Sequence, residues 1–430
     1  MQGAKIGLVL AALAFAAQAG PLQITAFAPQ GQISWSNAFK AGVCTLETAA
    51  RLGPDGTTAW TPWQNYFTTN TAGTGAFSPP IGQAFFRLRA VEIDTNGPGA
   101  FTNLVHSYGL LHTIAGSGAD PGKDNVNYWQ PSFEGGYATN AALSRPHFAM
   151  EDNAGNILIV DKNSHSVLKV TLDGRIYTVA GTHNAGNGTD GPAPATAVAL
   201  NQPNGLWVRG DGTFYVLDTG NSKVRKVTTN GVMTTLFTDS GGINTGRGLW
   251  VKDDESLVFY CSSSNLKEWT PASGVSKLNK QFNALGNIFL SGANLVATDR
   301  ADNTVWLVST NDGSRTLLFG NGGTNEVADG TLAATNSLWG VRGVWQPPVG
   351  GYFLATDEGS QLLYVDITGI VHVLANGSGD DHAGDRQWFY TPGFKFGQLR
   401  AVCLDRQGNL LVVENDVGFV RKIDFQRLSP

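Results

Sequence analysis

One segment begins with turn residues, continues as an apolar run and ends in an acid: Gly155-Asn156-Ile157-Leu158-Ile159-Val160-Asp161. It returns as Gly212-Thr213-Phe214-Tyr215-Val216-Leu217-Asp218 and as Gly408-Asn409-Leu410-Leu411-Val412-Val413-Glu414. Further copies occupy residues 293–299, 351–357 and, more weakly, 256–262. A short apolar run between turn residues is typical of a buried β-strand, and its return every ~40–60 residues indicates a repeat protein.

Other strands surround each copy. A third strand such as Val224-Arg225-Lys226-Val227 follows, and then a fourth such as Tyr177-Thr178-Val179-Ala180-Gly181. Four strands per unit in six units predict an all-β fold, a six-bladed β-propeller. The last unit stops near Phe425 without a fourth strand, whereas Leu111-His112-Thr113-Ile114-Ala115-Gly116 stands alone before the first complete unit. We therefore expect this N-terminal strand to complete the last blade, which removes exposed sheet edges.

The units resemble NHL repeats over residues 109–425. The segment from Pro203-Asn204-Gly205-Leu206 to Arg225-Lys226-Val227 is the best copy, and the loop 190–197 resembles an inter-blade loop of bacterial members. The third and fourth units lack the Pro-x-Gly start. The resemblance implies a propeller that binds protein, RNA or carbohydrate, and the relatives include lyases and lactonases. The fold therefore does not determine the function.

The composition excludes several classes of protein. The chain has 430 residues, 54 glycines, 15% charged residues and a formal net charge of -5. This excludes a basic nucleic-acid binder, and 42% hydrophobic residues exclude a disordered chain. Three cysteines, Cys44, Cys261 and Cys403, are too few for a disulfide scaffold. Each lies in a strand-like run, so we interpret them as buried small hydrophobes.

The chain divides into four predicted parts. Residues 1–19 have one early lysine, an apolar run and small residues before a cleavage site after Ala19, which indicates a signal peptide. Residues 20–92 alternate like short strands and loosely resemble a fibronectin type III β-sandwich; residues 93–108 are the linker and residues 109–430 the propeller. We expect a monomer without a membrane span, secreted or located in an extracellular or periplasmic space.

The first strand of each blade lines the channel of a propeller. Alignment of the units places five residues at one equivalent position at the start of that strand: His147, Asn204, Arg247, Arg342 and Arg400. The fourth unit offers Leu285-Gly286 there. Three arginines in a chain so poor in charge predict a ligand site for a carboxylate, sulfate or phosphate.

An acid ends the second strand of most units, near the same face. These acids are Asp161, Asp218, Asp299, Asp357 and Glu414. The alternative to a ligand site is that each arginine pairs with a neighbouring acid. The acids themselves are expected to hold turns through backbone hydrogen bonds.

Four loops on that face are long. They cover residues 117–143, 182–199, 321–337 and 376–397 and carry the aromatic residues Tyr128, Trp129, Trp388, Phe389, Tyr390 and Phe394. Aromatic rings beside polar groups suit sugars or protein partners. The alternative is that they pack over the blade ends as lids.

Metal-dependent catalysis is the competing hypothesis. Amidating lyases of related fold hold zinc with channel histidines, and here His147 could be joined by His183 and His382. Calcium is an alternative ion for Asp380, Asp381 and Asp385. No catalytic residue is assigned and enzyme activity stays open.

We favour a module that binds a protein, a carbohydrate or a small anionic ligand, and expect no nucleic acid. A metal-dependent hydrolase or lyase is the alternative. A structural component of the cell surface or extracellular matrix is the third hypothesis.

Overall fold

The protein is built from strands and short 3-10 turns. The computed structural model describes residues 7–8, 21–28, 31–39, 42–53, 58, 60–68, 70–77, 84–92, 110–118, 124–279, 281–347, 350–376, 396–406 and 408–424. No α-helix occurs among these residues, and none of them forms a helix long and apolar enough to cross a membrane. The fold is therefore all-β, with many small antiparallel sheets.

Six of these sheets follow one another between Leu110 and Asp424, each made largely from consecutive strands. The first contains β9 (Pro146–Glu151), β10 (Ile157–Asp161), β11 (Ser166–Val170) and β12 (Ile176–Gly181). The second contains β14 (Gly205–Val208), β15 (Phe214–Asp218), β16 (Lys223–Val227), β17 (Val232–Thr238) and the short β13 (Ala193–Pro194). The third contains β18 (Leu249–Val251), β19 (Val258–Ser262), β20 (Asn265–Thr270) and β21 (Gly274–Asn279).

The other three sheets have the same order. The fourth contains β22 (Leu285–Ser291), β23 (Asn294–Asp299), β24 (Thr304–Ser309) and β25 (Arg315–Phe319). The fifth contains β26 (Val341–Trp345), β27 (Tyr352–Thr356), β28 (Leu362–Val365) and β29 (Val371–Ala375). The sixth contains β30 (Leu399–Leu404), β31 (Leu410–Glu414), β32 (Phe419–Asp424) and β8 (Leu110–Ala115). The 3-10 turns are η2 (Pro131–Phe133), η3 (Ala138–Asn140), η4 (Ala195–Ala197), η5 (Thr219–Asn221) and η6 (Ala333–Thr335).

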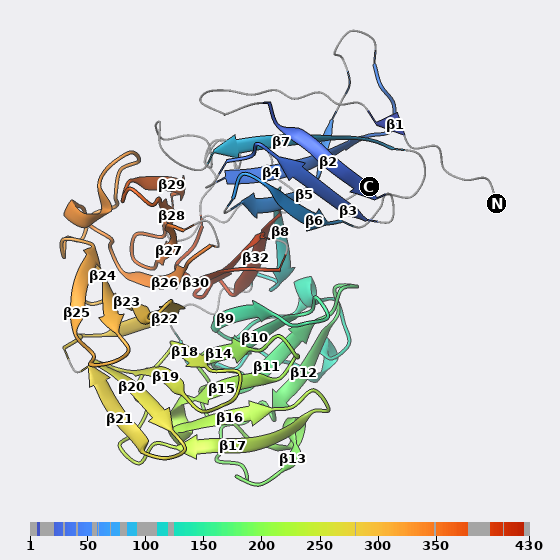
Figure 1. Cartoon of the computed structure of the whole chain (residues 1–430). Coiled ribbons are helices and arrows are strands. Elements are labelled where there is room, and N and C mark those ends of the chain that lie inside the picture. The colour runs from blue at the N-terminus through green and yellow to red at the C-terminus, as the bar shows by residue number, and fades with distance from the viewer. Residues whose placement is uncertain are drawn as a thin grey trace.

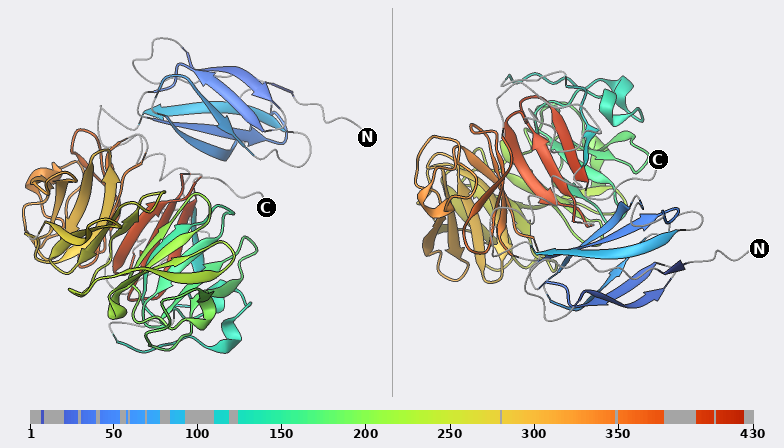
Figure 2. Two further views of the ribbon diagram at one scale, coloured as in Figure 1. Left: turned by 60° about the horizontal axis from the view of Figure 1, so that its bottom comes forward. Right: turned by 90° about the horizontal axis from the view of Figure 1, so that it is seen from above.

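The sheets form a ring (Figures 1 and 2), and this arrangement is a β-propeller. The first strand of each sheet packs against the first strand of the next, from β9 through β14, β18, β22 and β26 to β30, and β30 packs back against β9. The last sheet takes its outermost strand from the beginning of this region, because β8 pairs antiparallel with β32, with Ala115 opposite Val420. The first strands therefore enclose the centre of the ring.

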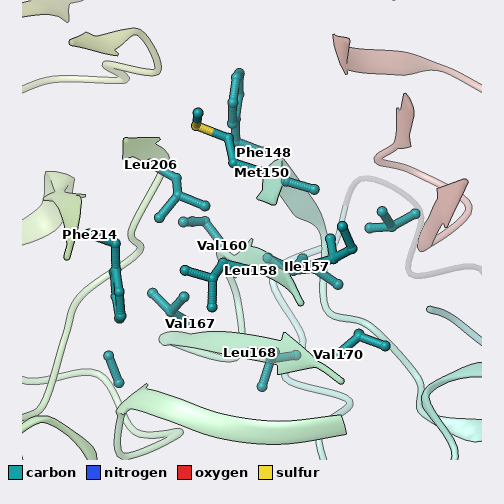
Figure 3. Packing of buried hydrophobic residues seen from close by; sticks show 14 of the residues in the cluster. Phe148, Met150, Ile157, Leu158, Val160, Val167, Leu168, Val170, Leu206 and Phe214 are labelled. Atoms are coloured by element: carbon teal, nitrogen blue, oxygen red, sulfur yellow. The ribbon is translucent and has the colours of Figure 1, made fainter. Parts of the chain in front are cut away.

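The core lies between neighbouring sheets. In Figure 3, Leu158 and Val160 of β10 lie between Phe148 of β9 and side chains of the second sheet such as Leu206 and Phe214. These side chains are almost fully buried. Burial of apolar surface at ~25 cal/mol per Å² is what stabilises each sheet on its neighbour.

The described residues up to Glu92 form two further sheets with a core of their own. One contains β4 (Gly42–Ala49), β5 (Thr61–Thr68), β7 (Phe85–Glu92) and β1 (Gly7–Leu8), and the other contains β2 (Gln23–Ala28), β3 (Gln32–Ser36) and β6 (Gly73–Ala76). Trp35 of β3, Leu46 of β4 and Phe86 of β7 share one buried cluster. The two sheets therefore pack face to face through apolar side chains.

Several predictions concern residues outside the described ranges. Of the predicted signal peptide, Gly7–Leu8 are described, as β1 paired parallel with Phe85 and Phe86 of β7. The other residues of the segment 1–19 and the whole linker 93–108 lie outside the described residues. The three cysteines are buried and free of disulfides, as the sequence predicted.

Closure of the ring by β8 can be tested at Leu111 of β8, which is fully buried between the fifth and sixth sheets. Leu111→Ala should lower the free energy of unfolding by about 2–5 kcal/mol, because it leaves a cavity at the closing strand. Leu172→Ala is the matched control: Leu172 is 81% exposed, and a change of at most about 0.5 kcal/mol is expected. Chemical denaturation measures both, and equal stabilities would contradict the closure.

Candidate ligand-binding site at the channel mouth

Three of the predicted channel residues owe their position to a β-bulge. In β9, Phe148 lies opposite Val160 and Pro146 opposite Asp161, so that His147 is the extra residue between two paired positions. The register shifts in the same way around Arg342 of β26 and Arg400 of β30. A bulge bends the strand and redirects a side chain. All three side chains are at least 94% buried at the same end of the ring.

The other positions follow the alignment less regularly. Asn204 directly precedes β14, and Arg247 lies two residues before β18. In the fourth sheet the register shifts between Leu285 and Ile288, so Asn287 is buried beside the bulge. The sequence had offered Leu285-Gly286 at this place, and Asn287 is the polar group that it missed.

Glycines allow the first strands to approach one another closely. A Cβ atom on Gly205 would lie 2.5 Å from the carbonyl oxygen of Arg247, and one on Gly286 would lie 2.8 Å from that of Arg342. Both distances are shorter than real contacts, so only glycine fits at these two positions. Neighbouring first strands therefore lie close together at these two positions.

Most of the blade-end acids bind backbone and not the channel arginines. Four of them accept N–H groups from the segment that leads into the first strand: Ser144 to Asp161 at 2.9 Å, Asn201 to Asp218 at 2.8 Å, Asn283 to Asp299 at 2.7 Å and Gly397 to Glu414 at 2.7 Å. Asp218 and Glu414 also pair with Arg225 and Arg421 of the third strand, at 3.0 and 2.9 Å. These four acids therefore hold turns through backbone hydrogen bonds, as the sequence analysis expected of them.

Asp357 is the exception, because it pairs with two channel arginines. Arg400 Nε lies 3.1 Å from Asp357 Oδ1, and Arg342 Nη2 contacts Asp357 Oδ2. Glu358 lies 3.3 Å from Arg342 and Asp416 lies 3.3 Å from Arg400. Burial raises the pKa of Asp357 to about 7, and the charge of Arg342 opposes that rise. Arg342 and Arg400 are thus largely neutralised within the protein.

Arg247 has no such partner among the described residues. Its Nε and Nη1 atoms are buried without a hydrogen-bond acceptor. Burial, followed by the charges of Arg342 and Arg300, lowers the pKa of Arg247, although an arginine stays protonated near neutral pH. Asn204 Oδ1 and Asn287 Nδ2 are likewise buried without partners. Buried polar groups in native proteins are normally satisfied, so these atoms are candidates for contacts with a ligand.

Three more cations reach the mouth that the alignment did not include. Lys162 follows Asp161, Arg300 follows Asp299, and Arg145 lies two residues before His147. Arg145 has a left-handed backbone (φ 67) and contacts Asp416 at 3.6 Å. Lys162 and Arg300 form no ion pair among the described residues. The residue after each blade-end acid was the signal that could have identified the first two.

The mouth is unfavourable for a divalent metal. His147 Nδ1 lies 3.0 Å from the carbonyl oxygen of Arg145. Burial, and then the charges of Arg247, Lys162 and Arg145, hold the pKa of His147 well below its usual range. The same charges would repel a dication.

The other proposed metal ligands do not join His147. His183 stacks on Trp129 with ring centroids 4.6 Å apart, and its Nε2 lies 2.8 Å from Thr178 Oγ1. His382, Asp380, Asp381 and Asp385 lie outside the described residues. Among the residues that are described, no three His, Cys, Asp or Glu side chains are grouped as a metal site requires.

The aromatic side chains of the first long loop pack against the protein. Tyr128 donates its hydroxyl to Asp124 Oδ2 at 2.6 Å, and Trp129 contacts Phe133 as well as His183. This favours the lid interpretation for Tyr128 and Trp129. The aromatic residues 388–390 and Phe394 lie outside the described ranges.

A groove of about 770 Å³ lies elsewhere, beside Glu151 at the far end of β9. Tyr137 and Leu172, both exposed, contribute to its wall. None of the mouth residues lines it. The groove is mainly apolar, whereas the unpaired charges gather at the mouth.

Comparison with known proteins defines the fold and no more. No family model matches the chain, and no curated protein matches it. A structure from Bacteroides thetaiotaomicron, described as of unknown function, covers 94% of this chain and 98% of its own, with 15% identity and a TM-score of 0.57. An auxiliary nutrient binding protein from Bacteroides ovatus covers 92% of this chain and 94% of its own, with 12% identity and a TM-score of 0.54. A second auxiliary nutrient binding protein, from Bacteroides thetaiotaomicron, has 12% identity, a TM-score of 0.54 and coverages of 95% and 99%.

The unequal roles of Asp357 and Arg247 predict opposite effects on stability. Asp357→Ala should lower the free energy of unfolding by about 3–5 kcal/mol, because it leaves Arg342 and Arg400 buried without their shared acid. Arg247→Met should leave stability unchanged or raise it, because it removes an unpaired buried charge and keeps the apolar stem. Thermal and chemical denaturation measure both. A loss for Arg247→Met as large as that for Asp357→Ala would contradict this assignment.

Proposed function

We propose that the protein is an exported six-bladed propeller of the NHL type that binds an anionic ligand at its channel mouth. The observation that carries this proposal is Arg247, which places two buried, unpaired N–H groups among other cations. An anion would satisfy those donors and reduce the repulsion at once. The contribution of such a contact is large, because charges interact strongly where water is excluded.

The charge balance supports an anion over a neutral ligand. The acids at the mouth, Asp357, Glu358 and Asp416, already contact Arg342, Arg400 and Arg145. Three further cations, Lys162, Arg247 and Arg300, form no ion pair among the described residues. These three cations therefore remain without an ion-pair partner in a chain whose net charge is -5.

The ligand class that fits best is a small carboxylate, including acidic sugars. Arginine donors and neutral amides such as Asn204 and Asn287 suit carboxylate and hydroxyl groups together. Two proteins of similar fold are described as auxiliary nutrient binding proteins, and we extend that role to this chain as a proposal. Residues 20–92 would then be a fibronectin type III-like module that follows a signal peptide cleaved after Ala19.

Arg247→Met tests the proposal directly. Galacturonate, citrate and inorganic phosphate are added to the wild-type protein and to Arg247→Met at constant ionic strength. A ligand at 100 times its dissociation constant should stabilise the wild type by about 2.7 kcal/mol. Loss of a charged hydrogen bond, about 1.5–3 kcal/mol, should weaken binding by Arg247→Met roughly tenfold or more. Thermal shift and calorimetry provide the measurement.

The choice of variant follows from the ion pairs. Simultaneous removal of Arg247, Arg342 and Arg400 would leave Asp357 buried alone, so a loss of binding could reflect unfolding. Arg175→Met is the control, since Arg175 pairs with Asp173 and packs over the ring of Tyr137, neither of which belongs to the mouth. If none of the three anions shifts the wild type, or if Arg247→Met binds equally well, the site assignment is wrong.

The alternative function, a metal-dependent hydrolase or lyase, has its own test. Elemental analysis of protein prepared without chelator would show stoichiometric zinc or calcium if a metal centre exists. The ligands would then have to include residues outside the described ranges, such as His382.

A further inference from the structure

The groove beside Glu151 lies between the closing strand and the first sheet. Residues 112–114 of β8 line one side, and the turns after β9 and β11, at 153–155 and 171–174, line the other. β8 belongs to the last sheet through its pairing with β32. The groove is therefore a consequence of ring closure, and it lies at the opposite end of β9 from His147.

Apolar side chains form much of the surface of this groove. Ile157 and Val170, which lie opposite each other in β10 and β11, line it although they are almost fully buried. Tyr137 and Leu172 are 57% and 81% exposed at its wall. Leu172 extends over the turn, since a Cβ atom on Gly155 would lie 3.2 Å from its Cδ2 atom. Large apolar side chains that gather at one concave surface commonly mark a binding site.

Tyr137 is held in place by its neighbours and remains accessible. Its backbone forms a bridge to Arg175, and the guanidinium carbon of Arg175 lies 5.0 Å from the centre of the Tyr137 ring. Arg175 in turn donates to the carbonyl oxygen of Gly135 at 2.8 Å. More than half of Tyr137 is still exposed. Its ring therefore offers the groove an ordered apolar surface.

Glu151 provides a polar group at one end of the groove. Its Oε2 atom accepts the backbone N–H of Arg406 at 2.7 Å. Its Oε1 atom accepts no hydrogen bond from the described residues, and a Cβ atom on Gly155, in the groove wall, would lie 3.7 Å from it. Burial raises the pKa of Glu151, because the carboxylate is poorly hydrated. A ligand that donates a hydrogen bond to Oε1 would compensate for that loss of hydration.

The charges around the groove balance when histidine is counted as neutral. The lining contains as many acids as basic residues, namely Glu151, Asp173, Arg406 and Lys422. Lys422 pairs with Asp405 at 2.8 Å, outside the lining. Neither sign of charge is in excess, so the groove favours a neutral ligand over an ion. A purely apolar ligand fits poorly, since it would cover the Glu151 carboxylate without offering it a donor.

We propose that this groove binds neutral oligosaccharides, with a sugar ring packed on Tyr137 and its hydroxyl groups bonded to Glu151 and Arg406. A sugar ring has an apolar face of C–H groups, which suits an aromatic side chain. Its hydroxyl groups both donate and accept, so one can donate to Glu151 and another can accept from the guanidinium of Arg406. The groove volume of about 770 Å³ is within the range of small-ligand sites, about 300–1,000 Å³. This second site is independent of the proposed anion site.

A glycan array tests this inference on the full chain. The array carries neutral α- and β-linked glucans, mannans, xylans and galactans, and calorimetry measures the dissociation constant of each glycan that binds. At least one should bind, and its affinity should not change between low and high salt, because a neutral ligand forms no ion pair. Absence of binding to all of these glycans would overturn the inference.

Substitutions in the groove locate the bound glycan. Tyr137→Ala should weaken binding about tenfold, because it removes the ring surface that the sugar covers, whereas Tyr137→Phe keeps the ring and should bind like the wild type. Glu151→Gln should also weaken binding about tenfold, through loss of a charged hydrogen bond. Leu332→Ala is the matched control and should bind normally, since Leu332 is 50% exposed and holds the corresponding bridge position in the fifth sheet, opposite Ile370.

The outcomes also separate this inference from the proposed function. Arg247→Met should leave glycan binding unchanged, so a glycan that this variant fails to bind lies at the mouth, which contradicts the groove assignment. Equal glycan affinity in Tyr137→Ala and the wild type contradicts it too, whether or not the anions bind. The neutral dye Nile red tests an apolar protein partner as the other occupant. Dye fluorescence that falls in Tyr137→Ala and Leu172→Ala, with no glycan bound, would exclude a sugar site.

Discussion

The pairing of β8 with β32 is the constraint on which the rest of the propeller depends. The final sheet is assembled from the two ends of the propeller region, with Ala115 opposite Val420. Without this pairing, β30 would have no reason to pack against β9, and the first strands would not enclose a channel. Residues that are almost 200 positions apart, such as His147 and Arg342, share one mouth because the ring is closed.

The charge at the mouth depends on which groups the blade-end acids bind. Asp161, Asp218, Asp299 and Glu414 bind backbone N–H groups, so four of the five blade-end acids stabilise turns. Asp357 alone among these five pairs with channel arginines. The cations beyond those pairs are held against their own repulsion.

Much of the fold was predictable, because its signal is periodic and local. Runs such as Ile157–Asp161 are typical of strands, and the isolated strand Leu111–Gly116 before the first complete unit predicted the outermost strand of the last sheet, which β8 forms. The candidate site was less predictable. Alignment of strand starts found Arg342, Arg400 and His147, each of which is the extra residue of a bulge. A bulge cannot be derived from composition, since it depends on the pairing of two strands.

The alignment missed Lys162, Arg300 and Asn287 for a related reason. Asn287 is displaced by an irregular register in the fourth sheet, and the other two follow the acids and do not begin a strand. Nor could the sequence show which acids bind backbone N–H groups and which pair with channel arginines. Asp161 and Asp357 end the same kind of apolar run, but one accepts a backbone N–H and the other meets two guanidinium groups.

The sequence by itself determined that this chain repeats a four-strand unit, that an acid ends the second strand of most units, and that three units have an arginine at one aligned position. These features follow from alternation of apolar and turn residues, which acts over a few residues at a time. Only the tertiary structure decided which charges neutralise each other and which remain. Ion pairing depends on distances across the ring, and those distances exist only after β8 has closed it.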